Sequence, residues 1–246
     1  VMPVAQEVLS WFWLSGLEVF AHPNTEAVVT TGDSITEGFN STPDTNARYP
    51  DELARRLAAR TPGQPKMAVL NAGISGNRIL SDVFGPNGQS RLDRDVLTES
   101  GATRIILLEG INDLGLGGSF FPPPVSAEQI IAGYKQVITR AKAQDMKIYL
   151  GTITPCKGFE AFVPGYWSPE VEAERQAVNA WIRGTEMHDG YVDFDLALRN
   201  PEDPESLLPI YDSGDFLHPS DAGYARMAEE AEKVLFAPAK GKGPRK

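Results

Sequence analysis

Three residues, one near the start of the chain and two near its end, have the side chains that nucleophilic ester chemistry requires. The first, Ser34, follows the apolar, β-branched run AVVTT (residues 27–31) and Gly32, so we expect it on the turn after a buried parallel strand. Ligands bind at the carboxyl ends of strands in open α/β sheets, and a serine beside a glycine at that edge is placed to be a nucleophile. The alternative is that Ser34 only caps the following helix, and this interpretation is favoured when Ser34 is considered without the rest of the chain.

A serine nucleophile needs a base, and His218 is the best candidate among the three histidines. His22 lies in the first 26 residues and His188 lies in the turn before the last predicted strand, and we expect both at the surface. Asp215 precedes His218 by three residues, a spacing that in a turn can aim its carboxylate at Nδ1 and hold the imidazole tautomer. The alternative is a histidine at a helix start beside a solvated aspartate.

Two further residues can supply hydrogen-bond donors at the same edge. Gly76 follows the second predicted strand, and Asn112 follows the third. The Gly76 N–H or the Asn112 side-chain amide can bind an anion. The simpler interpretations are that Gly76 is only a turn glycine and that Asn112 only forms an Asx turn. Three other carboxylates, Glu109, Asp195 and Asp212, could compete with Asp215 as the partner of His218, but none has the Asp-x-x-His spacing. Asp33 and Asp113 are predicted to hold turns together.

Five short apolar runs alternate with helix-like segments along the chain. The predicted strands are residues 27–31, 67–70, 104–109, 147–152 and 191–194. The predicted helices begin near Pro50, Arg91, Ser126, Ser168 and Ser220. This alternation predicts an α/β domain with three layers, α/β/α, around a five-stranded parallel sheet. In the flavodoxin-like strand order 2-1-3-4-5 the switch point lies between strands one and three, and this order brings Ser34 and Asn112 together.

The motifs GDSI (32–35), GISGN (73–77), GIND (110–113) and DFLHP (215–219) together resemble those of the SGNH, or GDSL-type, hydrolase superfamily. The resemblance covers residues 28–236, with no departure at the four residues that give the superfamily its name. It implies that Ser34 is the nucleophile, that His218 is the general base and that Asp215 orients His218. It also implies an oxyanion hole formed by the backbone N–H groups of Ser34 and Gly76 and the side chain of Asn112.

Three long loops follow strands three, four and five, so we expect them to form the rim of the site. They carry the aromatic residues Phe120, Phe121, Phe159, Phe162, Tyr166 and Trp167. The stretches around residues 12–16, 74–78 and 108–113 resemble the acetylxylan-esterase-like carbohydrate esterases, in which a β-sandwich often precedes the catalytic domain. This resemblance implies a serine esterase for short acyl esters, in particular acetyl esters of carbohydrate. The alternatives are a lysophospholipase- or thioesterase-like acylhydrolase and a non-catalytic carbohydrate-binding protein on a hydrolase fold.

The composition and net charge of the chain limit the classes of molecule that it can be expected to bind. The chain has 246 residues, of which 41% are hydrophobic, and this fits one large α/β domain. The net charge is −10, and four basic residues after position 237 contribute +4, so the rest carries −14 and disfavours nucleic acid or an anionic membrane. No apolar run is long enough to span a membrane, no residues have metal-ligand spacing and no phosphate loop is present. We therefore expect a small-molecule or carbohydrate ester as substrate and no cofactor, while the oligomeric state stays open.

Both ends of the chain are expected to lie outside the catalytic domain, which is predicted to be residues 28–236. Residues 1–27 are predicted to be a lead-in segment packed on the domain, and residues 237–246 a disordered basic tail. The residues Trp11, Trp13, Leu17 and Val19 predict that the lead-in forms one or two short strands or a flap packed on the domain. Since the chain does not begin with Met, we expect that a leader or upstream module has been removed, and we favour an extracellular over a cytoplasmic location. The single cysteine, Cys156, excludes an internal disulfide.

Overall fold

The computed structural model describes residues 13, 16–60, 67–116 and 124–236. Its centre is a five-stranded parallel sheet with the strand order β2-β1-β3-β4-β5. In chain order the strands are β1 (Glu26–Gly32), β2 (Met67–Gly73), β3 (Ala102–Leu108), β4 (Lys147–Gly151) and β5 (Gly190–Val192). The predicted fold class and strand order are confirmed, and every strand overlaps its predicted range.

The central strands form where uninterrupted apolar residues can be buried on both faces of the sheet. Val28 and Val29 of β1 and Ile105 and Ile106 of β3 are completely buried. β1 pairs with β2 on one side and with β3 on the other, and Gly32 at its end lies opposite the last residue of each neighbour. The carboxyl ends of three strands therefore meet at one edge of the sheet.

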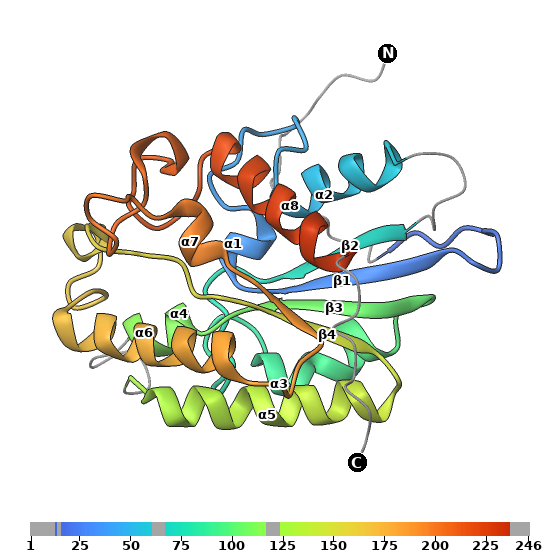
Figure 1. Ribbon diagram of the computed structural model, residues 1–246, viewed down its shortest axis with the longest axis horizontal. Helices are drawn as coiled ribbons and strands as arrows, with labels where there is room; N and C mark the ends of the chain where they lie inside the picture. Colours follow the sequence, from blue (N-terminus) through green and yellow to red (C-terminus); the bar gives the residue numbers. More distant parts are fainter. Residues whose placement is uncertain (1–12, 14–15, 61–66, 117–123, 237–246) are drawn as a thin grey trace.

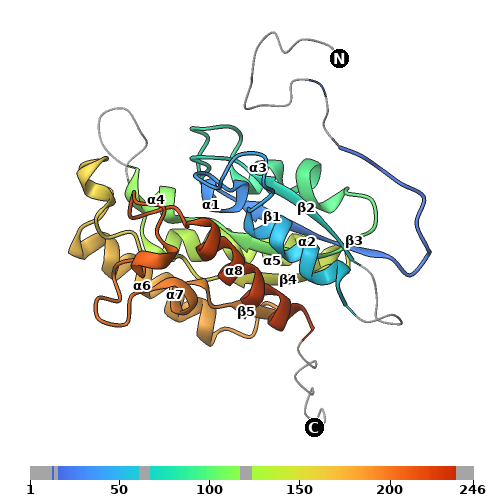
Figure 2. The same ribbon diagram turned by 90° about the horizontal axis from the view of Figure 1, so that it is seen from above.

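Helices cover both faces of the sheet, as the predicted three-layer arrangement requires (Figure 1). One face carries α2 (Tyr49–Ala58) and α8 (Asp221–Leu235), which contact each other, and Figure 2 looks onto this face from above. The opposite face carries α3 (Gly88–Leu92), α5 (Ala127–Ala143) and α6 (Pro169–Gly184).

Side-chain caps fix the beginnings of the long helices where the sequence predicts them. The hydroxyl oxygen of Ser168 accepts a hydrogen bond from the N–H of Val171, and that of Ser220 accepts one from Gly223. Before α5, Gln129 reaches back to the N–H of Ser126 as in a capping box. These caps terminate the loops that run back from the strand ends.

Several short helices are absent from the sequence prediction. They are α1 (Ser34–Glu37), α4 (Ile111–Gly115), α7 (Phe194–Leu198) and the 3₁₀ turns η2 (Phe159–Ala161) and η3 (Pro209–Tyr211). The short helix predicted to begin near Arg91 is present as the end of α3 and the π-helical turn η1 (Asp93–Leu97). The prediction that the fifth strand extends to Phe194 is wrong. The side chain of Asp193 accepts a hydrogen bond from the N–H of Leu196, and this cap starts α7 directly after β5.

The predicted strands of the lead-in are absent from its described residues, 13 and 16–25, although the hydroxyl of Ser100 donates a hydrogen bond to the carboxylate of Glu18. These residues form no strand, and the side chains of Leu17, Val19 and Phe20 are exposed. Figure 2 shows the blue segment before β1 reaching away from the helices and strands. Trp11 and the tail 237–246 lie outside the described residues.

Candidate active site

Ser34 lies directly beyond the carboxyl end of β1. The side chain of Asp33 accepts a hydrogen bond from the N–H of Ile35 at 3.0 Å, so Asp33 caps α1 and Ser34 is the first residue of that helix. The alternative that Ser34 itself is the cap is therefore wrong. A side chain at Gly32 would meet the carbonyl oxygen of Leu108 at 1.9 Å, so only glycine lets β1 approach β3 this closely.

The loop before α8 brings His218 to Ser34. The imidazole Nε2 lies 2.8 Å from the Ser34 hydroxyl oxygen, and Nδ1 lies 2.6 Å from Oδ2 of Asp215. Oδ1 of Asp215 closes the turn between Asp215 and His218, because it accepts hydrogen bonds from the backbone N–H groups of Leu217 and His218. The predicted Asp-x-x-His turn geometry is thus present, and it contacts Ser34, which lies 184 positions before His218 in the chain.

The environment of Asp215 favours its ionised form. Partial burial by itself raises the pKa of this carboxyl, but the hydrogen bonds from the ring and backbone of His218 and from Leu217 outweigh it and hold the pKa below its ordinary value. Asn40 adds a donor that the sequence does not predict, because its Nδ2 lies 2.9 Å from Oδ2 of Asp215. A carboxylate with these donors can stabilise an imidazolium at His218.

Asn112 and Gly76 line the same cleft as Ser34 and His218. Asn112 lies in the first turn of α4, immediately after β3, and its Nδ2 donates a hydrogen bond to the backbone carbonyl of Asn77 at 3.0 Å. Its Oδ1 accepts one from the hydroxyl of Tyr166 at 2.8 Å. The two contacts fix the plane and the orientation of the Asn112 amide.

The conformation of Gly76 explains why no other residue fits there. Its φ angle is +75°, and a Cβ atom at this position would lie 2.4 Å from the ring of Phe84. The turn and the close packing both require glycine. Gly76 lines the cleft, and the Phe84 ring packs against it where a side chain would otherwise stand.

The cleft that holds these residues has a volume of about 200 Å³. Its walls are mostly apolar and consist of Phe39, Phe84, Leu116, Phe159, Val163, Tyr166 and Leu217. Two of these rings flank the imidazole of His218, with centroids 4.6 Å away for Phe39 and 6.2 Å for Phe159. A second cleft, of about 220 Å³, is lined by Thr25, Leu57, Ala58, Met67 and Ala68, none of which can act as a nucleophile–base pair.

The rival carboxylates have other contacts. Asp195 is buried and pairs with Arg175 and Arg183, and Asp212 accepts hydrogen bonds from backbone N–H groups within its own loop. Asp113 binds the N–H groups of Ile79 and Leu80, as expected of a residue that holds a turn. Glu109 is completely buried beneath the site, and neither of its carboxyl oxygens has a hydrogen-bond partner in the described structure.

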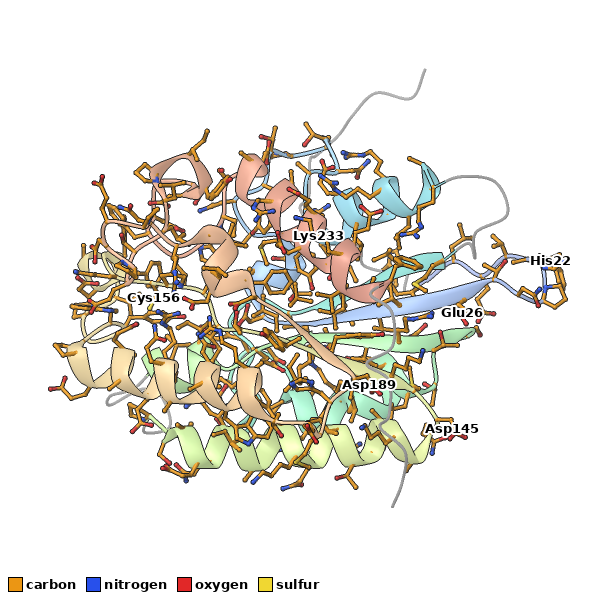
Figure 3. All side chains as sticks on the ribbon, viewed as in Figure 1. His22, Glu26, Asp145, Cys156, Asp189 and Lys233 are labelled. Carbon is orange, nitrogen blue, oxygen red and sulfur yellow. The ribbon has the colours of Figure 1, made fainter. Side chains whose placement is uncertain are left out.

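The other histidines and the cysteine lie away from this chemistry. Figure 3 shows exposed His22 at one end of the molecule, beyond Glu26 at the start of β1, as predicted. His188 is adjacent to Asp189 before β5 and is half-buried rather than exposed, because its Nε2 contacts the carbonyl oxygen of Ile182 at 2.8 Å. Cys156 is buried, and burial raises the pKa of its thiol to about 12, so it is not a competing nucleophile.

The aromatic loop residues differ in what they contact. Phe159 and Tyr166 line the cleft, while Phe162 is 60% exposed and packs against Phe159 and Phe216 at its outer side. Trp167 packs under the Lys157 ammonium group instead. Phe120 and Phe121 lie outside the described residues.

The described part of the chain contains neither a metal site nor a membrane-spanning helix. No group of three or more His, Cys, Asp or Glu side chains in this part of the chain could hold a metal ion. Over the same residues, no helix is both long enough and apolar enough to cross a bilayer.

Comparison with known proteins identifies relatives of the chain. Residues 30–226 match the model of the GDSL-like lipase/acylhydrolase family. No curated protein matches the sequence.

Solved structures share the fold at low sequence identity. An acetylxylan esterase from Geobacillus stearothermophilus is 22% identical with a TM-score of 0.63, and the match covers 89% of this chain and 97% of that one. A GDSL-like lipase from Bacteroides thetaiotaomicron is 18% identical with a TM-score of 0.62, covering 87% and 89%. An α/β hydrolase from the metagenome of Lake Arreo, Spain, is 20% identical with a TM-score of 0.63, covering 85% and 94%.

Proposed function

The chain belongs to the GDSL-like lipase/acylhydrolase family and is a carboxylic ester hydrolase, and we propose that it cleaves short acyl esters through an acyl-enzyme intermediate on Ser34. The observation that carries the proposal is the continuous contact from Asp215 to His218 to the Ser34 hydroxyl, at 2.6 and 2.8 Å. A nucleophile within hydrogen-bond reach of a base that is itself oriented by a third group is the arrangement that activates a serine.

The reaction follows from these contacts in two half-reactions. Nε2 of His218 takes the Ser34 hydroxyl proton while Oγ attacks the ester carbonyl, and the same nitrogen then delivers that proton to the leaving alcohol oxygen. In the second half-reaction His218 takes a proton from a water molecule, whose oxygen attacks the acyl carbon on Ser34. The Oγ–acyl bond then breaks, the imidazolium returns the proton to Oγ of Ser34, and the carboxylic acid leaves. Asp215 keeps the proton of the neutral imidazole on Nδ1 and stabilises the imidazolium that forms in each step.

Negative charge develops on the carbonyl oxygen in both tetrahedral intermediates. We assign its binding to the backbone N–H groups of Ser34 and Gly76 and to the side-chain amide of Asn112, all of which belong to residues lining the cleft. The Asn77 carbonyl accepts one of the two hydrogens on Nδ2 of Asn112, and the second serves the oxyanion. Fixed donors of this kind are worth ~10²–10³ each in kcat.

The size of the cleft supports a short acyl group. Its volume of about 200 Å³ is below the ~300–1,000 Å³ of pockets that enclose drug-sized ligands. We therefore infer acetyl esters as the preferred substrates and carbohydrate as their alcohol portion. Two partly exposed rings support carbohydrate, since sugar rings can stack on them: Phe39 beside the imidazole, and Phe162 on the outer side of Phe159. An acetylxylan esterase shares the fold.

The test is hydrolysis of p-nitrophenyl acetate, butyrate and octanoate by the wild type and by Ser34→Ala, with acetylated xylan measured in parallel. Ser100→Ala is the matched control, because Ser100 lies before β3 at the opposite end of the sheet. We expect acetate to be preferred, Ser34→Ala to lose on the order of 10⁶ in kcat and the control to stay active.

Each alternative has its own outcome. A rate that rises with chain length would replace the short-acyl proposal with a lysophospholipase- or thioesterase-like activity. Folded wild-type protein that binds acetylated xylan without turnover would refute the esterase proposal and leave a carbohydrate-binding protein.

A further inference from the structure

We propose that Arg91 is a positioning residue that sets the geometry of the oxyanion hole, an inference that rests on the proposed roles of Ser34, Gly76 and Asn112. Arg91 lies on α3, outside the cleft, and only 2% of its surface is exposed. Its guanidinium group makes four hydrogen bonds. The longest, at 3.5 Å, goes to the carboxylate of Asp95, and each of the other three ends on a backbone or side-chain segment adjacent to one of those residues.

Two of the bonds hold the ends of neighbouring strands. Nη2 donates to the carbonyl oxygen of Gly32 at 2.9 Å, and Nη1 donates to that of Ala72 at 2.5 Å. Gly32 is the last residue of β1, two positions before Ser34, and Ala72 lies near the end of β2, four positions before Gly76. One planar group therefore fixes the separation of the two segments that supply the backbone donors.

The third bond reaches Asn112 through one intermediate residue. Nε of Arg91 donates to Oδ1 of Asn77 at 2.9 Å, and the backbone carbonyl of Asn77 accepts the hydrogen bond from Nδ2 of Asn112. The side-chain amide of Asn77 also donates to the carbonyl oxygens of Phe84 and Pro86. These hydrogen bonds fix the position of Asn77, so its backbone carbonyl can orient the Asn112 amide.

The pattern of contacts differs from that of an ordinary buried ion pair. The nearest carboxylates to Arg91 are Asp95 at 3.5 Å and Glu109 at 3.9 Å, both farther away than the three uncharged oxygens. Arg175, which is equally buried, instead bonds directly to the carboxylates of Glu172 and Asp195. Arg91 thus acts mainly as a rigid fork of donors, a geometry that a lysine ammonium group cannot reproduce.

The test compares Arg91→Lys with the matched control Arg175→Lys, using steady-state kinetics on p-nitrophenyl acetate and thermal unfolding. We expect Arg91→Lys to lower kcat by ~10- to 10³-fold, the range in which displaced oxyanion donors act, with KM changed by less than about threefold. Arg175→Lys should lower the melting temperature and leave kcat near the wild-type value. Asn77→Ala, a second variant that removes the Nε acceptor together with the hydrogen bonds of the Asn77 amide to Phe84 and Pro86, should reproduce the kcat loss.

A double-mutant cycle separates positioning from general destabilisation. If Arg91 acts through Asn112, then Arg91→Lys should cost much less in an Asn112→Ala background, because the group that it positions is already absent. Multiplicative losses in the double variant would overturn the proposal, and so would folded Arg91→Lys or Asn77→Ala with wild-type kcat. Inactivity of the wild type itself would instead contradict the proposed esterase function.

Discussion

Glu109 gives the structure its strongest predicted dependence of stability on pH. Its side chain is completely buried between β3 and α3, and neither carboxyl oxygen has a hydrogen-bond partner in the described part of the chain. Burial raises the pKa of this carboxyl from 4.5 to about 8, against the attraction of Arg91, whose Nη2 lies 3.9 Å away. Glu109 is therefore protonated in the folded protein at neutral pH.

The sign of the effect follows from proton linkage. Because the folded state holds this proton more tightly than the unfolded chain, it binds more protons between pH 4.5 and about 8, and the free energy of unfolding falls as the pH rises through that window. At ~1.4 kcal/mol per tenfold change in proton affinity the loss is at most about 5 kcal/mol, and we expect about 2–5 kcal/mol. This is a large fraction of a typical domain stability of ~5–15 kcal/mol.

The perturbation that reveals it is Glu109→Gln, which keeps the shape and cannot titrate. Urea unfolding followed by circular dichroism at about pH 5 and about pH 9 should show that the wild type loses about 2–5 kcal/mol more than the variant over this interval. Glu128→Gln, which removes an exposed carboxylate from α5, should behave as the wild type does. Parallel losses in the wild type and Glu109→Gln would refute the reasoning, because Glu109 would then be ionised in both states.

Two further predictions concern catalysis. Tyr166→Phe leaves Oδ1 of Asn112 buried without its donor, at a cost of ~1–3 kcal/mol, so we expect a lower melting temperature and a kcat reduced about tenfold or more, measured by calorimetry and p-nitrophenyl acetate kinetics. Asp215→Asn should keep the fold and lose ~10⁴ in kcat, because the amide favours the wrong imidazole tautomer. Asp212→Asn is its control and should stay within a few-fold of the wild type, and the opposite ranking would mean that Asp215 does not orient His218.

The strands and long helices could be predicted because their signals are local. A buried parallel strand needs a continuous apolar run, as in residues 27–31, and Ser168 and Ser220 announce their helices by the residue types at the first turn. The short helices α1, α4 and α7 could not be predicted, since a segment of four or five residues is too short to show helical periodicity. A missed signal was Asp193, whose capping side chain separates β5 from α7.

The site residues divide in the same way. Asp215 and His218 could be paired from their spacing, because three residues in a turn define the geometry. Asn40, Tyr166 and Arg91 could not, since their contacts with Asp215, Asn112 and Gly32 span 175, 54 and 59 positions and depend on how the loops and α3 are placed. No residue type in a local window distinguishes such a supporting contact from an ordinary surface or core side chain.

The carboxyl groups around Ser34 show how the fold itself selects the partner of His218. Desolvation raises the pKa values of Asp33, Glu109 and Asp113, which lie beneath the site and repel one another, whereas the donors around Asp215 hold its pKa below the ordinary value. Asp215 is thus the carboxylate kept ionised beside the imidazole, while protonation of Glu109 removes a negative charge from under the developing oxyanion. Environments that separate carboxyl pKa values assign acid–base roles. Here the donors that lower the pKa of Asp215 come mainly from His218, so the low pKa is a consequence of the contact between these two residues.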